Sequence, residues 1–155
     1  MIPARIFEFK SFKFNQISNM KVLLIYCKRF AYNPTVKTLD SAEEITNGQT
    51  YKNTQVAFIQ VEEEDKENEK SIKKNLRNTL KWIDRKNQPE HLLLHSFAHL
   101  SDSKASPEYT REFLNYIEEW MKERDYSISQ TPFGYFLDLQ VEAPGFSLAR
   151  VFKEF

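Results

Sequence analysis

Cysteine, net charge and long apolar runs are scarce or absent in this sequence. A single cysteine, Cys27, excludes an internal disulfide and a multi-cysteine zinc site, and it fits a reducing cytoplasm. Twenty-two basic residues balance twenty-two acidic ones, so nothing indicates a broad electrostatic nucleic-acid binder, and any nucleic-acid partner has to be bound by a local site. No apolar run approaches the roughly 20 residues that span a bilayer, so we expect no membrane partner.

What is present indicates one folded globular domain. The chain has 155 residues, of which 41% are hydrophobic and 14% aromatic. Residues 1–19 lack the apolar core of a signal peptide, because lysines and a glutamate interrupt them. Two interpretations of residues 1–19 stay open. They are an extension upstream of a domain that covers residues 20–155, or an added edge strand, since Phe7 and Phe9 alternate as in a strand.

We predict an α/β fold in which two main helices pack on a mixed β-sheet. The spacing of the apolar residues between 72 and 83 predicts an amphipathic helix over about 67–87. Ser106 followed by Pro107 is typical of a helix start, and the second helix should end near Arg124. Residues 38–53 are polar, with a turn at Asn47-Gly48. The predicted strands are 21–27, 54–61, 91–97, 126–129, 133–141 and 146–152.

The three histidines of the chain, His91, His95 and His99, are spaced four residues apart, as in a metal-binding helix face. Residues 91–97 are short and apolar and follow a proline, so they predict a strand instead. Residues four apart on a strand are roughly 13 Å from each other, whereas zinc–nitrogen bonds are about 2.0–2.1 Å. We therefore expect no metal and no other cofactor, and we interpret His91 and His95 as partnered or surface residues of the strand.

Two segments are candidates for a ligand site. His99 follows the predicted strand, where the rim of an α/β sheet commonly binds ligands, and it could position a polar substrate or move a proton near neutral pH. A structural role for His99 stays open. Pro132-Phe133-Gly134-Tyr135 is a tight bend whose glycine lets a ligand approach the backbone, or a turn whose aromatic rings fill the core.

Three segments together resemble the N-terminal editing domain of archaeal-type threonyl-tRNA synthetase: "KVLLIYC" (21–27), "HSFAHLSDSKASPE" (95–108) and "TPFGYFLDLQV" (131–141). The resemblance covers roughly residues 20–155 and implies a D-aminoacyl-tRNA deacylase-like fold in a freestanding module. It also implies a pocket for the aminoacylated 3′ end of tRNA, where a wrongly attached amino acid, typically serine on threonine tRNA, is hydrolysed. Such a second site supplies discrimination that binding alone cannot, because serine and threonine differ by one methyl group.

The resemblance also implies roles for particular residues. His99 matches the histidine of the family's Phe-Ala-His motif and is the expected catalytic residue. The expected substrate-binding residues are Phe97, Ala98, Ser101, Pro132, Phe133, Gly134 and Tyr135. In the family, the Pro-Phe-Gly-Tyr bend is followed by tyrosine and lysine, which here are Phe136 and Leu137, and a glutamate of the last strand falls on Arg150.

Leu137 removes a charge-assisted hydrogen bond, and one such preorganised donor can be worth a few kcal/mol of barrier. Arg150 and Lys28 could replace the lost groups electrostatically, and we expect His99, Tyr135 and Arg150 to line one cleft. The sequence leaves two functions open. One is a cytoplasmic deacylase acting in trans for translation quality control. The other is a non-catalytic relative that binds an aminoacyl-adenosine-like ligand, a tRNA 3′ end or a protein partner. By analogy with deacylases of this fold we expect a homodimer, and an interaction with a threonyl-tRNA synthetase is open.

Overall fold

The computed structural model describes residues 19–155. The interpretations of residues 1–19 therefore fall outside the described residues, except for Asn19. Within residues 19–155 there is no helix long and apolar enough to cross a membrane.

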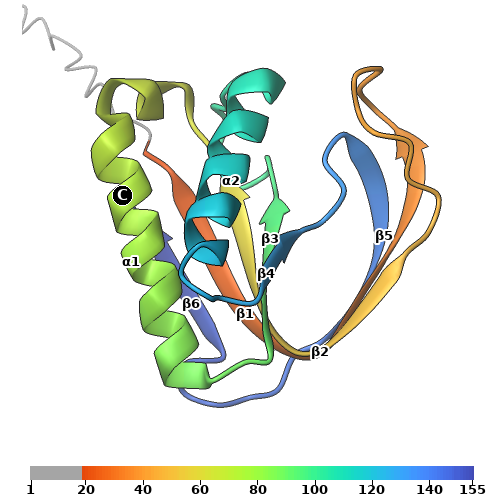
Figure 1. Cartoon of the computed structure of the whole chain (residues 1–155), viewed down its shortest axis with the longest axis vertical. Helices are drawn as coiled ribbons and strands as arrows, with labels where there is room; N and C mark the ends of the chain where they lie inside the picture. Colours follow the sequence, from red (N-terminus) through yellow and green to blue (C-terminus); the bar gives the residue numbers. More distant parts are fainter. Residues whose placement is uncertain (1–18) are drawn as a thin grey trace, which may run out of the picture.

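One mixed sheet organises the molecule (Figure 1). Strand β1 (Lys21–Lys37) pairs antiparallel with β2 (Gln49–Gln60), from Lys21 opposite Gln60 to Tyr32 opposite Gln49. Strands β3 (His91–Ser96) and β4 (Ile128–Gln130) continue the sheet in parallel beyond β2. On the other side of β1, β6 (Arg150–Glu154) pairs with its first half and β5 (Tyr135–Glu142) with its second half.

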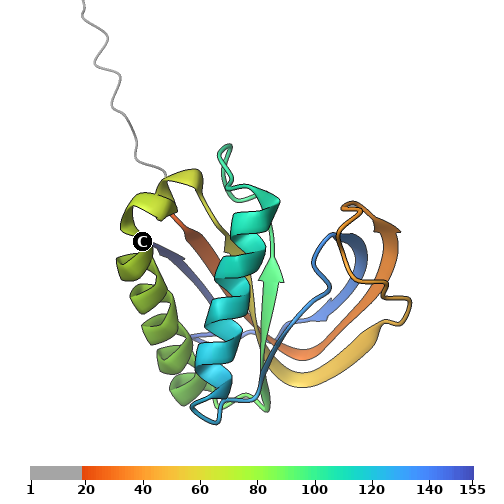
Figure 2. The ribbon, with the colours of Figure 1, turned by 45° about the horizontal axis from the view of Figure 1, so that its top comes forward.

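Both long helices, α1 (Glu69–Asn87) and α2 (Pro107–Lys122), cover the same face of the sheet (Figure 2). A short 3-10 helix, η1 (Glu63–Asn68), leads into α1. The main core lies between this face and the helices, and it includes Leu24, Ile59, Leu94, Leu76 and Ile117. A second apolar cluster, around Phe30, Phe58 and Leu93, lies within the curled part of the sheet. Burial of this much apolar surface is the main stabilising contribution to the fold.

The predicted start of α2 is confirmed in detail. Ser106 is the N-cap, its hydroxyl accepts from the backbone N–H of Tyr109 at 3.3 Å, and Pro107 is the first helical residue. This satisfies one of the amide groups that a helix start leaves unpaired. The end of α1 is also fixed locally, because Gln88 adopts a left-handed conformation and its N–H donates to the carbonyl of Asp84.

The structure corrects the predicted extent of three strands. Strand β1 continues to Lys37, and β2 already begins at Gln49, so residues 49–53 are not part of a polar connection. Residues 28–37 include buried Phe30 and Tyr32, but the exposed residues 33, 35 and 36 interrupt the apolar pattern, and residues 49–53 are polar and mostly exposed. The last strand begins at Arg150 rather than 146, because residues 146–149 form a turn closed by the Ala149 N–H on the Phe146 carbonyl.

Candidate functional site

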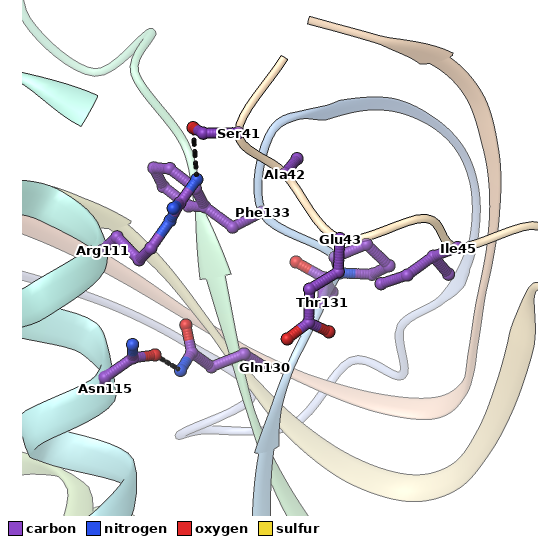
Figure 3. Close-up of a pocket in the computed structure, with 10 residues that line it drawn as sticks. Ser41, Ala42, Glu43, Ile45, Arg111, Asn115, Gln130, Thr131 and Phe133 are labelled. Atoms are coloured by element: carbon purple, nitrogen blue, oxygen red, sulfur yellow. Dashed lines mark hydrogen bonds between the residues drawn. The ribbon is translucent and has the colours of Figure 1, made fainter. Parts of the chain in front are cut away.

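Two adjoining cavities lie where β2 and β3 end and where the chain bends into β5. The first, here called the strand-end cavity, has a volume of about 230 Å³ and is walled by those strand ends, the first turn of α2 and residues 132–134. The second, here called the Arg111 cavity, has a volume of about 250 Å³ and is lined by residues of the 41–45 segment, α2 and residues 130–133 (Figure 3). Pro132 and Phe133 belong to both linings, so the bend separates the two cavities.

Gln60 fixes the loop that carries the Phe-Ala-His-Leu-Ser motif. It is the last residue of β2, and its side chain is only 1% exposed. Its amide nitrogen donates to the carbonyl groups of Ser101 and Ser103, and its amide oxygen accepts from the Leu100 N–H. A buried amide whose nitrogen and oxygen both have hydrogen-bond partners is held in one orientation. The sequence analysis missed Gln60, although a polar residue closing an apolar strand was a usable signal.

The three residues of the Phe-Ala-His motif do not all face the strand-end cavity. Ala98 lines the strand-end cavity. Phe97 packs edge-on against Phe58 at 5.5 Å between ring centroids and contacts the second apolar cluster. His99 is exposed, and its ring lies 5.2 Å from that of Phe97. The Ser101 hydroxyl accepts from the Ser103 N–H at 3.4 Å, so Ser101 takes part in the loop's own structure.

The glycine of the Pro-Phe-Gly-Tyr bend is required by its surroundings. Gly134 has a φ of +83°, and a Cβ there would lie 2.8 Å from the Cβ of Ala42 and 3.2 Å from that of Leu39. Its carbonyl accepts from the Thr38 N–H at 2.7 Å. The absent side chain therefore makes room for the 38–42 segment, which closes one wall of the strand-end cavity through residues 38 and 39.

Tyr135 holds a neighbouring loop. Its hydroxyl donates to the Glu43 carbonyl at 2.7 Å and accepts from the Ile45 N–H at 3.1 Å. Both bonds connect the start of β5 to a segment about 90 residues earlier, and that segment lines the Arg111 cavity. Tyr135 itself belongs to neither lining, so its contact with the site is through the loop that it holds.

The remaining predicted positions lie away from both cavities. Arg150 is exposed on β6, pairs with Ile25 of β1, and donates to the Pro144 carbonyl at 2.9 Å. His99, Tyr135 and Arg150 are absent from both linings, so the structure does not gather them in one of these cavities. Leu137, where the family has lysine, packs on the second apolar cluster and lies opposite Pro34 of β1.

His91 and His95 lie on β3, as the sequence predicted, and both are partnered. His95 is 7% exposed, and its Nδ1 is 2.8 Å from the Thr131 hydroxyl, next to the bend. Burial lowers the pKa of His95 to about 4, so the ring is neutral at physiological pH. The His91 nitrogens lie 2.7 and 2.6 Å from the hydroxyls of Ser127 and Ser129. Among residues 19–155 no group of three histidine, cysteine or acidic side chains could hold a metal ion.

The strand-end cavity is electropositive. Lys104 is the only charged residue in its lining, which contains no carboxylate. The first turn of α2 also forms part of the wall, through Pro107 and Thr110, and a helix N-terminus carries a partial positive charge. A site with this charge stabilises a negative oxygen better than a positive group.

Sequence comparisons connect this chain to known proteins. The sequence profile of the Archaea-specific editing domain of threonyl-tRNA synthetase matches residues 20–155. Similar proteins include the threonine–tRNA ligases of Staphylothermus marinus, 31% identical over 138 residues, and Nitrosopumilus maritimus, 34% identical over 136 residues. Each alignment covers 86% of this chain but only 22% and 21% of the ligases, so the chain spans about a fifth of the length of these relatives.

Among solved structures, the c-Myc DNA Unwinding Element Binding Protein is similar, with a TM-score of 0.62 over 86% of this chain and 97% of that chain. The identity is 12%, so this likeness concerns the fold alone. The predicted α/β class, a mixed sheet packed with two main helices and of the D-aminoacyl-tRNA deacylase type, is confirmed. Because the profile match runs through nearly all of the described residues, this chain belongs to the family of archaeal-type threonyl-tRNA synthetase editing domains.

Proposed function

We propose that the strand-end cavity binds the aminoacylated 3′-terminal adenosine of tRNA, and that the chain hydrolyses serine from mischarged threonine tRNA in trans. The observation that carries the proposal is the electropositive, carboxylate-free lining beside the Phe-Ala-His motif, in a member of the editing-domain family. A threonyl-tRNA synthetase is the natural source of this substrate, since the relatives that the chain matches are threonine–tRNA ligases. We place both in the cytoplasm.

The chemistry needs no bound cofactor. The oxygen of a water molecule attacks the ester carbonyl carbon, and negative charge develops on the carbonyl oxygen. Lys104, an exposed lysine of the lining, and the first turn of α2 stabilise that charge electrostatically, and stabilisation of the developing oxyanion lowers an acyl-transfer barrier. The bond between the carbonyl carbon and the ribose oxygen then breaks, and the ribose oxygen takes up the proton that the water gives up. Our candidate for moving this proton is His99 of the family's motif, which lies outside the lining and follows Ala98 in the loop at the wall.

A second function has its own supporting observation. Leu137 replaces the family's lysine and packs on an apolar cluster, so position 137 supplies no charge to a substrate. A chain that keeps the pocket but lacks this charge would bind an aminoacyl-adenosine-like ligand, a tRNA 3′ end or a protein partner without hydrolysing anything. The two functions differ in one quantity, the rate of ester hydrolysis.

Deacylation of seryl-, threonyl- and D-aminoacyl-tRNA distinguishes them. We expect seryl-tRNA to be hydrolysed well above the uncatalysed rate, and His99→Ala and Lys104→Gln each to slow the reaction by about 10²-fold or more. Arg150→Gln in the same assay tests the electrostatic role that the sequence analysis gave to that guanidinium. If no substrate is cleaved while an adenosine analogue still binds, the chain is the non-catalytic relative.

We also propose that the protein is a homodimer. Leu139 and Val141, two residues apart on one face of β5, are 38% and 46% exposed. Apolar surface of this kind commonly marks a protein interface. Light scattering after size exclusion should give twice the monomer mass of 18.5 kDa. A monomeric mass at micromolar concentration would contradict the dimer.

A further inference from the structure

The Arg111 cavity shares a wall with the strand-end cavity, but its other lining residues are different (Figure 3). Pro132 and Phe133 separate the two spaces. A polynucleotide whose last residue enters the strand-end cavity has to leave it, and the neighbouring cavity lies directly beyond the shared wall. The side chains that line this second cavity can therefore contact the rest of the ligand and help to select it.

Arg111 is held in place while most of its donors remain available. Its guanidinium lies over the ring of Phe133 at 5.4 Å from the centroid, and one nitrogen donates to the Ser41 hydroxyl at 3.3 Å. Among the residues that the structure describes, no carboxylate forms an ion pair with it. A guanidinium that is positioned but not neutralised is suited to a phosphate, which it can bind through two parallel hydrogen bonds.

An amide pair on the opposite side of the cavity has a fixed orientation. The Gln130 amide nitrogen donates to Glu118 at 2.6 Å and to the Asn115 oxygen at 2.9 Å, so both of its hydrogens are used. The Gln130 oxygen and the Asn115 nitrogen then have no partner within the described part of the chain. In Figure 3 both point to the side of the pair on which Arg111 lies. The cavity thus offers one acceptor and one donor next to each other.

We propose that the Arg111 cavity binds the nucleotide that precedes the terminal adenosine, with the phosphate that links the two nucleotides on Arg111 and the base edge on the Asn115–Gln130 pair. This inference rests on the proposed function. The nucleotide in that position of every tRNA is a cytidine, whose base presents an amine donor beside ring acceptors. The Gln130 oxygen matches the amine, and the Asn115 nitrogen matches an acceptor. Glu43 also lines the cavity, and a carboxylate there favours the cytosine amine.

Two non-hydrolysable probes test the inference. One is adenosine that carries serine through a 3′-amide, and the other is the same compound extended to the dinucleotide cytidylyl-adenosine. We expect the dinucleotide to bind about tenfold more tightly, as suits one charge-assisted contact and a base contact. Arg111→Gln should remove this gain and leave the adenosine probe unaffected. Arg85→Gln, an exposed arginine at the end of α1, is the matched control and should keep the gain.

Two further readouts separate a phosphate contact from a general structural effect. Loss of one phosphate contact from a single strand should reduce the slope of log Kd against log salt by about 0.7 for the dinucleotide. Replacing cytidine by uridine puts a carbonyl against the Gln130 oxygen, so it should cost about fivefold in affinity, comparable to one lost hydrogen bond. Asn115→Ala should weaken the dinucleotide and not the adenosine probe.

The outcomes are distinguishable. Equal affinities for the two probes, or an Arg111→Gln protein that keeps both the gain and the salt slope, would overturn the nucleotide site and leave the proposed function standing. Failure of the unaltered protein to bind either probe would overturn the proposed function itself.

Discussion

Gln60 provides the most specific test of how the site is built. Its three hydrogen bonds to the backbone of residues 100, 101 and 103 are made by one fully buried amide. Gln60→Leu keeps the approximate volume of the side chain and removes all three. At about 1 kcal/mol net for each bond, the free energy of unfolding should fall by about 2–3 kcal/mol, and less where water reaches the half-buried loop.

Urea denaturation measures this loss, and Gln140→Leu is the matched control. Gln140 is exposed on β5 and should change stability by no more than about 0.5 kcal/mol. Because Gln60 holds the loop that carries Ala98 and Lys104, Gln60→Leu should also weaken binding of the seryl-adenosine amide. A Gln60→Leu protein as stable as the control, with unchanged affinity for that probe, would refute the reasoning.

Gln60→Glu gives a pH-dependent version of the same test. The carboxylate would face the carbonyl oxygens of Ser101 and Ser103, so the folded state would favour its protonated form and raise its pKa. A raised carboxyl pKa means that the folded state binds the proton more tightly than the unfolded state does. The variant should therefore lose stability, relative to the unaltered protein, as the pH rises above about 4. Parallel stability curves for the two proteins would contradict this.

Three further predictions concern the bend and the buried titrating groups. Gly134→Ala should destabilise the fold by about 1–2 kcal/mol or more, because of its positive φ and the contact with Ala42; Gly145→Ala, which meets nothing within 4 Å, should be neutral in the same urea titration. Burial lowers the pKa of His95 to about 4 and raises that of Asp65 to about 6. His95 therefore makes stability rise with pH between about 4 and 6.5, while Asp65 makes it fall between about 4 and 6. His95→Gln should expose the falling slope and Asp65→Asn the rising one in melting curves at several pH values, and unchanged slopes would count against these pKa shifts. Tyr135→Phe should raise the KM for seryl-tRNA by loosening the 43–45 loop and leave kcat nearly unchanged; an unaltered KM would show that the loop does not contribute to binding.

The sequence was sufficient for elements whose signals are local. The apolar run of β3 between two helices and the Ser106-Pro107 start of α2 are fixed by neighbouring residues, and both are where the sequence predicted them. The second half of β1 has a mixed signal, because buried Phe30 and Tyr32 are followed by mostly exposed residues. It contains Pro34 and several exposed polar residues, and it is a strand because β2 and β5 pair with it.

The site was predictable only in part, for the same reason. The two motifs do supply lining residues, Ala98 and Pro132–Gly134. The contacts of Tyr135 and Gln60 join segments that are about 40 to 90 residues apart, so neither segment alone identifies the partner, even where a polar residue at the end of an apolar strand marks Gln60 itself. The Arg111 cavity likewise depends on the packing of α2 against the 41–45 segment, which no spacing in the sequence indicates.

A crystal structure of the protein with the seryl-adenosine amide tests the central claim most directly. We expect the amide carbonyl in the strand-end cavity, close to Ala98 and Lys104, with the adenosine 5′ oxygen directed toward Arg111. Density for the analogue at another surface, or an empty strand-end cavity at saturating analogue, would contradict the account.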